Sequence, residues 1–198
     1  MNKKELISHL RSFNFPKEIL EAFEKVDREK FISQNLKKYA YEDIALPLGN
    51  DSTISQPFTI AFMLNLLELK RNQKVLEIGS GSGYVLALIS KIIGKKGKLI
   101  GIEIEKELYK RSKEILKNHK NIQIFCKNGK DGLPEQAPFD RILISASCKK
   151  EPSHLSSQLN NSGIILSSVK QSIVKIKKQG NQVETHEFPG FVFVPLRE

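Results

Sequence analysis

Apolar positions in the first 70 residues recur at helical spacing in two places, separated by a less regular stretch at 39–51. The apolar face of the first predicted helix comprises Ile19, Leu20, Phe23 and Val26. The apolar face of the second comprises Ile60, Met63, Leu64 and Leu67. Pro16 suits the first turn of the first helix, and Pro57 suits that of the second. The pattern therefore predicts a largely helical segment over residues 1–70.

From Lys74 onward, short apolar runs alternate with helical stretches. Strands are predicted at 75–78, 99–102, 122–125, 141–145 and 163–168. Helices are predicted at 84–93, 105–118 and 152–159. Because such strands are joined by right-handed crossovers, this alternation predicts a parallel, doubly wound sheet with helices on both faces.

The last predicted strands, at 173–178, 183–188 and 191–194, come without helices between them. Gly180 and Asn181 join the first pair, which favours a tight antiparallel hairpin. The predicted fold class is therefore α/β: a doubly wound, mostly parallel, Rossmann-like sheet with a C-terminal antiparallel hairpin and N-terminal helices. No linker, repeat or low-complexity tract interrupts the 198 residues, so a single domain is predicted.

The composition is that of a folded, soluble protein, with 39% hydrophobic and 27% charged residues. No window approaches a membrane span, and the first residues lack the apolar region of a signal peptide. We therefore expect no membrane association and a cytoplasmic location. Cys126 and Cys148 lie at neither disulfide-framework nor zinc spacing, so we expect two small core residues and no metal site.

The formal net charge of +10 raises the question of nucleic-acid binding. Residues 1–70 carry no net charge, so the whole excess lies in residues 71–198. It is densest over 91–120, where 10 basic side chains accompany 4 acidic ones and Tyr109 is the only aromatic residue. Single-strand binders add aromatic stacking platforms to positive charge. We therefore expect lysine-rich solvated surface and no specific nucleic-acid partner, with RNA binding as an alternative.

A glycine-rich run, Gly79-Ser80-Gly81-Ser82-Gly83, leads from the first core strand directly into a helix. Small residues let the backbone approach a ligand, and a helix N-terminus offers N–H groups to an anionic group. A P-loop is excluded, because no Lys-Ser/Thr pair follows. Glu103 ends the next strand, where an acid can accept both ribose hydroxyls. The run predicts a nucleotide-cofactor site; the alternative is a plain turn, with Glu103 only a helix-capping acid.

Residues 128–132 form a polar loop after the third core strand, at the same predicted sheet edge. An amide or carboxylate in this loop is suited to binding the edge of an adenine. Asn128 and Gly129 are therefore candidate cofactor-binding residues. The alternative is an ordinary turn, which Asn and Gly also favour.

Several motifs carry a resemblance to one family. Residues 75–84, VLEIGSGSGY, look like the S-adenosylmethionine loop of class I methyltransferases. Upstream lies Thr53-Ile54-Ser55-Gln56-Pro57, preceded by IALPLG at 44–49. Further pieces are REKF at 28–31, APFD at 137–140 and FVPL at 193–196. Together, across about residues 16–196, they resemble the protein-L-isoaspartate O-methyltransferases, and the run at 53–57 is far more specific than the glycine loop.

This resemblance implies methyl transfer from S-adenosylmethionine to the α-carboxylate of L-isoaspartyl residues in damaged proteins, which is a repair reaction. It implies that Ser55 is the active-site hydroxyl, while Thr53 and Ile54 help to close the site over cofactor and substrate. Without the resemblance, Ser55 is an ordinary helix N-cap. The glycine run would hold the methionine end of the cofactor and Glu103 its ribose. Residues 1–70 would then be a substrate lid on a cofactor-binding core at 71–198, and we expect a monomer.

Three places depart from the family pattern. Asn128 stands where the family usually has an Asp that accepts a hydrogen bond from the adenine amine. A neutral bond is worth roughly 0.5–1.5 kcal/mol against roughly 1.5–3 kcal/mol for a charged one, so somewhat weaker cofactor binding is expected. Lys127 and residues 147–150, SCKK, differ near the substrate rim. These departures leave open a class I methyltransferase that acts on another peptide carboxylate, or on RNA.

Overall fold

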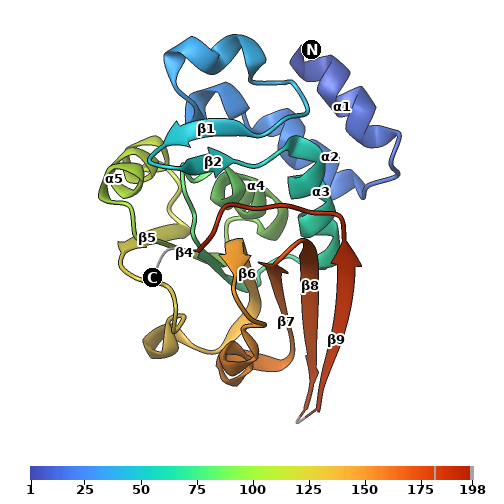
Figure 1. Cartoon of the computed structure of the whole chain (residues 1–198), viewed down its shortest axis with the longest axis vertical. Coiled ribbons are helices and arrows are strands. Elements are labelled where there is room, and N and C mark those ends of the chain that lie inside the picture. Colours follow the sequence, from blue (N-terminus) through green and yellow to red (C-terminus); the bar gives the residue numbers. More distant parts are fainter. Residues whose placement is uncertain (181, 197–198) are drawn as a thin grey trace.

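The computed structural model describes residues 1–180 and 182–196. At its centre lies a seven-stranded sheet in the order β5-β4-β3-β6-β7-β8-β9 (Figure 1). The parallel strands are β3 (Lys74–Ile78), β4 (Lys98–Glu103), β5 (Ile122–Cys126), β6 (Phe139–Cys148) and β7 (Leu159–Val169). The antiparallel strands are β8 (Ser172–Gln179) and β9 (Gln182–Pro189). Because the chain places β4 and β6 on opposite sides of β3, the strand order reverses there and leaves a crevice at the carboxyl edge.

The two faces of the sheet are covered differently. Val75, Leu99 and Leu143 belong to an apolar cluster that includes buried side chains from the first four α-helices, and Ile115 of the fifth packs against it. These helices are α1 (Lys3–Arg11), α2 (Lys17–Lys25), α3 (Pro57–Leu66), α4 (Tyr84–Ile93) and α5 (Lys106–Ile115). The opposite face packs against Leu133 and Leu155, which lie in loops and 3-10 turns. None of the helices in the described ranges combines the length and apolar character needed to cross a membrane.

Among the described residues, the shorter elements are four 3-10 turns and a hairpin. The turns are η1 (Arg28–Phe31), η2 (Gln34–Tyr39), η3 (Pro134–Gln136) and η4 (Ser153–Gln158). The hairpin consists of β1 (Leu46–Gly49) and β2 (Ser52–Ile54), which pair in antiparallel orientation. It lies within the stretch that the sequence pattern left irregular, and it sits above the carboxyl edge of the large sheet (Figure 1).

The mostly parallel sheet, the N-terminal helices and the helix at 84–93 are confirmed. Other boundaries differ: the helix expected at 105–118 ends at Ile115, Pro16 is the N-cap of α2, and the helix expected at 152–159 is the 3-10 turn η4. Prolines at 134, 138 and 152 interrupt both connections on that face, which explains the absence of an α-helix there in the described residues. Cys126 is exposed and Cys148 half-buried, so the expectation of two core cysteines was wrong.

The strand predicted at 191–194 was also wrong. Pro189 and Gly190, whose φ is 96°, end β9 and turn the chain back across the top of the sheet (Figure 1, dark red). There the Ser147 N–H donates to Val194 O and the Leu196 N–H donates to Ser147 O, each at 2.8 Å. The tail thus pairs with the end of β6 rather than with β9. Asn181, which the predicted hairpin turn includes, lies outside the described residues.

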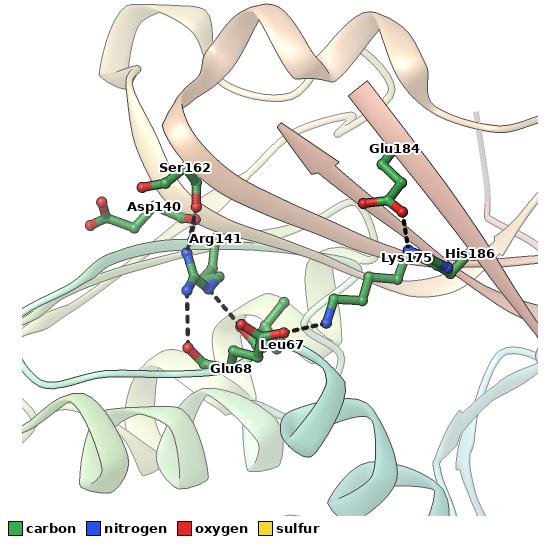
Figure 2. A network of polar contacts seen from close by, with 8 residues as sticks. All are labelled: Leu67, Glu68, Asp140, Arg141, Ser162, Lys175, Glu184 and His186. Atoms are coloured by element: carbon green, nitrogen blue, oxygen red, sulfur yellow. Dashed lines mark hydrogen bonds and ion pairs between the residues drawn. The ribbon is translucent and has the colours of Figure 1, made fainter. Parts of the chain in front are cut away.

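A polar network ties the end of α3 to the sheet (Figure 2). Arg141 on β6 is buried, and its guanidinium donates to Leu67 O at 2.6 Å and to Glu68 O at 3.0 Å. The Glu68 carboxylate in turn accepts a hydrogen bond from Lys175 on β8 at 2.5 Å. These bonds satisfy carbonyl groups that a helix end leaves without partners. They fix the direction of α3, whose other end begins beside Ser55.

Candidate active site

A pocket opens at the carboxyl edge of β3, at the point where the strand order reverses. One wall is the glycine loop, with Gly79, Ser80, Gly81 and Ser82. Facing it are Thr53, Ile54 and Ser55. The remaining walls are formed by Leu48, Ile60, Met63, Leu64, Glu77, Tyr84, Val85, Leu143, Ser145 and Phe193. The fold therefore brings together two predicted groups of residues that lie far apart in the sequence.

The glycine loop is held tightly between β4 and α5. The N–H groups of Gly79 and Ser80 both donate to Ile102 O, at 2.9 and 3.0 Å. Gly83 is the N-cap of α4 with φ of 84°, and a Cβ there would lie 2.7 Å from Leu116 Cδ1. A side chain at this position would be strained both by the backbone conformation and by the contact. The loop is thus a close-fitting turn into a helix N-terminus, as the sequence predicts.

Glu103 braces the glycine loop from the end of β4. Its Oε2 accepts the Gly81 N–H at 2.6 Å, and its Oε1 accepts the Glu105 N–H at 2.8 Å. Glu105 is the N-cap of α5, so Glu103 does contact the start of that helix, as the alternative interpretation expects. Glu103 is buried and does not line the pocket itself. Each carboxylate oxygen has a further lone pair, so the predicted ribose contact is compatible with this bracing role.

Asn128 and Gly129 follow β5 at the same edge, but neither lines the pocket. Asn128 is exposed, and its Oδ1 accepts the Lys130 N–H at 2.8 Å, which makes a local turn. Gly129 is packed so closely that a Cβ would lie 2.4 Å from Ile78 Cγ2. The plain-turn alternative therefore describes the local geometry. The adenine role of this loop stays a prediction.

Ser55 lies between β2 and α3 and is half-exposed at the pocket wall. The alternative in which Ser55 caps α3 does not hold, because the N-cap is Gln56, whose side chain accepts no backbone N–H of the helix. Instead, the Asp43 carboxylate accepts the Phe58 N–H at 2.8 Å and a hydrogen bond from Gln56 Nε2 at 3.0 Å. The Ser55 hydroxyl makes no hydrogen bond to any described residue. It is therefore available to a bound molecule.

A buried arginine that the sequence pattern does not single out for a role holds this segment in place. Arg28 has no exposed surface, and its guanidinium donates to Ser55 O at 3.1 Å. It also donates to Ala40 O at 2.9 Å, Glu42 O at 3.3 Å and Ile44 O at 2.9 Å. Burial lowers the pKa of this guanidinium, while Tyr84 and Asp43 act in the opposite sense. The one sequence signal was its place in the REKF motif at 28–31.

Glu77 is a second residue without a predicted role. It is 1% exposed, and its Oε1 accepts the Ser145 hydroxyl at 2.7 Å. Its Oε2 is buried at the pocket wall with no partner among the described residues. Burial raises the pKa of this carboxyl to about 8; the Ser145 bond opposes the rise and the nearby Glu103 charge adds to it. An acid inside the otherwise apolar run 75–78 was the available sequence signal.

The first strand of the parallel sheet runs into a glycine loop, and the same pocket contains the buried, unpartnered Glu77 Oε2. This arrangement suits a cofactor with a cationic group. Together with the relatives below, this fold and site define an S-adenosylmethionine-dependent methyltransferase. A sequence profile described as protein-L-isoaspartate(D-aspartate) O-methyltransferase matches residues 1–198. The chain therefore belongs to the protein-L-isoaspartate O-methyltransferase family.

Individual relatives agree with this assignment. A protein-L-isoaspartate O-methyltransferase of Thermosipho melanesiensis is 40% identical over 197 residues, covering 96% of this chain and 100% of the relative. That of Ignicoccus hospitalis is 38% identical, covering 99% and 97%. A solved protein-L-isoaspartate O-methyltransferase superposes with a TM-score of 0.92 at 26% identity, covering 100% of this chain and 66% of its own. A Plasmodium falciparum protein assigned to the same activity, in complex with S-adenosyl-L-homocysteine, gives 0.86 at 25% identity, covering 100% and 99%.

Proposed function

We propose that this chain methylates the α-carboxylate of L-isoaspartyl residues in damaged proteins at the pocket between the glycine loop and Thr53-Ile54-Ser55. The observation that carries the proposal is this juxtaposition, since one motif is suited to the cofactor and the other resembles the family far more specifically than the glycine loop does. We also propose that residues 1–198 act as one methyltransferase domain, as a monomer without a nucleic-acid partner. The two free cysteines agree with a reducing compartment such as the cytoplasm.

The methyl-transfer reaction requires mainly that the carboxylate oxygen, the methyl carbon and the sulfur are aligned. S-adenosylmethionine supplies an activated methyl group on a sulfonium, and the attacking carboxylate is already ionised at neutral pH. No general base is needed, and positioning alone can contribute on the order of 7–11 kcal/mol. In this proposal the Ser55 hydroxyl donates to the substrate carboxylate and orients it, and Thr53 and Ile54 exclude water from above. His9, His119, His154 and His186 have no role in this step.

The residues present fit the cofactor. The unpartnered Glu77 Oε2 at the pocket wall is a suitable acceptor for the ammonium of its methionine part. The backbone of Gly79 to Gly83 would pass beneath it, Glu103 would hold the ribose, and Asn128 and Gly129 would lie at the adenine. Glu77 would then be ionised by its partner, although burial alone favours its protonated form.

Glu77→Gln is expected to stabilise the cofactor-free protein at alkaline pH. The folded-state pKa of Glu77, about 8, is above its ordinary value of 4.5, so the native state binds the proton more tightly than the unfolded state. Stability is therefore lost as pH rises from about 4.5 to about 8, and glutamine removes this loss. Thermal denaturation should show equal melting temperatures near pH 5 and a higher one for the variant near pH 8.5. Glu107→Gln, at an exposed site, is the matched control.

The same Glu77→Gln protein should bind S-adenosylmethionine about ten-fold or more weakly, because the ammonium loses a charged acceptor. Calorimetric titration measures this directly. Unchanged affinity would remove Glu77 from the proposed cofactor site, whatever the melting curves show.

Asn128→Asp is expected to leave cofactor affinity equal or to tighten it by up to about ten-fold, since a charged acceptor replaces a neutral one. The local turn should survive, because an Asp oxygen can accept the Lys130 N–H that Asn128 accepts. Calorimetric titration of both proteins is the measurement, with Asn35→Asp at an exposed position as the control for net charge. Markedly looser binding would refute the placement of Asn128 at the adenine.

The proposed function is tested by a methyl-transfer assay on an isoaspartyl peptide, its normal aspartyl twin and bulk RNA. The expected result is label in the isoaspartyl peptide alone. Label only in the aspartyl twin would instead support an enzyme for another peptide carboxylate, and label only in RNA would support a nucleic-acid methyltransferase. Either result would overturn the proposal.

A further inference from the structure

An open groove lies at the edge of the sheet opposite the candidate active site, where β3, β4 and β5 begin. Its cationic side chains are Arg71, Lys91, Lys95, Lys96 and Lys120, all of them exposed. None of the residues that line it is an Asp or Glu. Within residues 1–180 and 182–196, none of the five cations forms an ion pair. The groove therefore concentrates uncompensated positive charge.

The rest of the basic stretch behaves differently. On α5, Lys110 pairs with Glu107 at 2.9 Å, and Lys117 pairs with Glu114 at 2.5 Å just beyond the helix. These lysines form the solvated surface that the charge pattern predicts for the whole of 91–120. The groove cations come instead from the end of α4 and from three connecting loops. The tertiary fold, rather than the spacing along one helix, therefore brings these cations close together.

The frame beneath these cations is ordered. The Ser90 hydroxyl donates to Asn121 Oδ1 at 3.0 Å, and Asn121 Nδ2 donates to Gly94 O at 3.2 Å. A Cβ on Gly94 would lie 2.9 Å from Arg71 Nη1, so the guanidinium rests against the Gly94 backbone. His119 Nδ1 is buried there with no partner among the described residues. A charged ligand would thus meet side chains on a fixed support, which lowers the entropy cost of binding.

We propose that this groove docks an acidic segment of the protein substrate, remote from the isoaspartyl residue that reacts. This inference rests on the proposed function, which makes a polypeptide the macromolecule that the enzyme must hold. Arg and Lys side chains without acidic neighbours are complementary to a run of carboxylates. No Phe, Tyr or Trp side chain lines the groove to stack a base, so the lining favours a polypeptide over single-stranded nucleic acid.

The separation of the two sites sets the length of substrate required. β4 begins at Lys98 near the groove and ends at Glu103 near the active site, a span of roughly 17 Å at roughly 3.3 Å per residue. An extended peptide needs at least about five residues between its acidic run and its isoaspartate to cover this distance, and more to pass around the surface. Beyond that length the second contact becomes intramolecular and raises the effective concentration of the reacting residue.

The test compares isoaspartyl peptides that carry a glutamate run or a glutamine run, joined by flexible linkers of about four or about sixteen residues. The enzymes are the wild type, the groove variant Lys95→Glu/Lys96→Glu and the matched variant Lys110→Glu/Lys113→Glu on α5, which has the same net charge. With the long linker, the glutamate run should lower the wild-type KM by about ten-fold relative to glutamine, with kcat unchanged. The groove variant should lose this gain and the α5 variant should keep it.

A short peptide without a tail is methylated equally by all three enzymes if the groove acts only in docking. If none of the three enzymes methylates that short peptide, the proposed function itself is contradicted. This outcome is distinguishable from a loss of docking, which changes only the effect of the glutamate run. The docking proposal is overturned if the glutamate run has no effect, if it acts equally with the short linker, or if both charge variants lose the gain alike. If duplex DNA or RNA competes for the groove more strongly than the glutamate-run peptide does, the groove would be assigned to nucleic acid instead.

Discussion

Replacing Arg28 with methionine is expected to lower the free energy of unfolding by about 3–5 kcal/mol, because a buried guanidinium that serves four carbonyl groups is lost. Methionine fills a similar volume, so the loss reports on hydrogen bonds more than on packing. For a chain of this size each kcal/mol shifts the melting temperature by about 2–4 °C, so a fall of about 6–20 °C should appear in thermal denaturation.

Arg11→Met is the matched control, since Arg11 is exposed and its guanidinium pairs with Glu24 on the surface at 3.4 Å. Surface pairs of this kind are worth about 0–1 kcal/mol, so its melting temperature should barely change. Arg28→Lys should fall between the two, because one ammonium cannot reach carbonyls on both sides as a planar guanidinium does. An Arg28→Met protein that melts with the wild type would show that those carbonyls find other donors.

Ser55→Ala is expected to lower kcat by about ten- to one-hundred-fold, which is the value of one hydrogen bond to a charged group. Cofactor affinity should be unchanged, because the hydroxyl is proposed to contact the substrate carboxylate alone. The melting temperature should also be unchanged, since Ser55 does not cap α3. Steady-state kinetics, calorimetry and thermal denaturation on one preparation separate these three quantities.

Ser52→Ala is the control for Ser55. Ser52 is the first residue of β2, the strand that leads to Ser55; its hydroxyl donates to Asn50 O at 3.4 Å, and it does not line the pocket. It should keep wild-type turnover. Wild-type turnover in Ser55→Ala would remove Ser55 from the proposed catalytic role, and a drop in melting temperature would instead support a structural role.

Much of the core could be predicted because its elements are local. The apolar run at 75–78 and the glycine run after it specify strand, turn and helix within a few residues, and α4 has the predicted bounds. The tail at 191–194 could not be predicted as it is, because its partner is the Ser147 backbone rather than the adjacent strand. Its apolar residues favour a strand equally well, and only the tertiary fold decides what they cover.

The residues of the candidate site also fall into those that the sequence identifies and those that only the fold reveals. The glycine loop and Ser55 are recognisable from motifs, and the fold brings both to one pocket. Arg28 and Glu77 are not recognisable, because their importance comes from burial. An Arg and a Glu are ordinary surface residues unless the fold removes them from water, and then each must find a partner or bind a ligand. Arg28 donates hydrogen bonds to backbone carbonyl groups, whereas Glu77 Oε2 has no partner among the described residues.

The contact of Glu68 with Lys175 joins positions 107 residues apart in the chain. Contacts of such separation form late in folding, because the loop between them must close first. We therefore expect the Glu68 contact to form only once β8 has joined the sheet, whereas the glycine loop and its flanking strand can assemble earlier from neighbouring residues. During refolding, protection of α3 amides from hydrogen exchange should consequently lag behind that of α4.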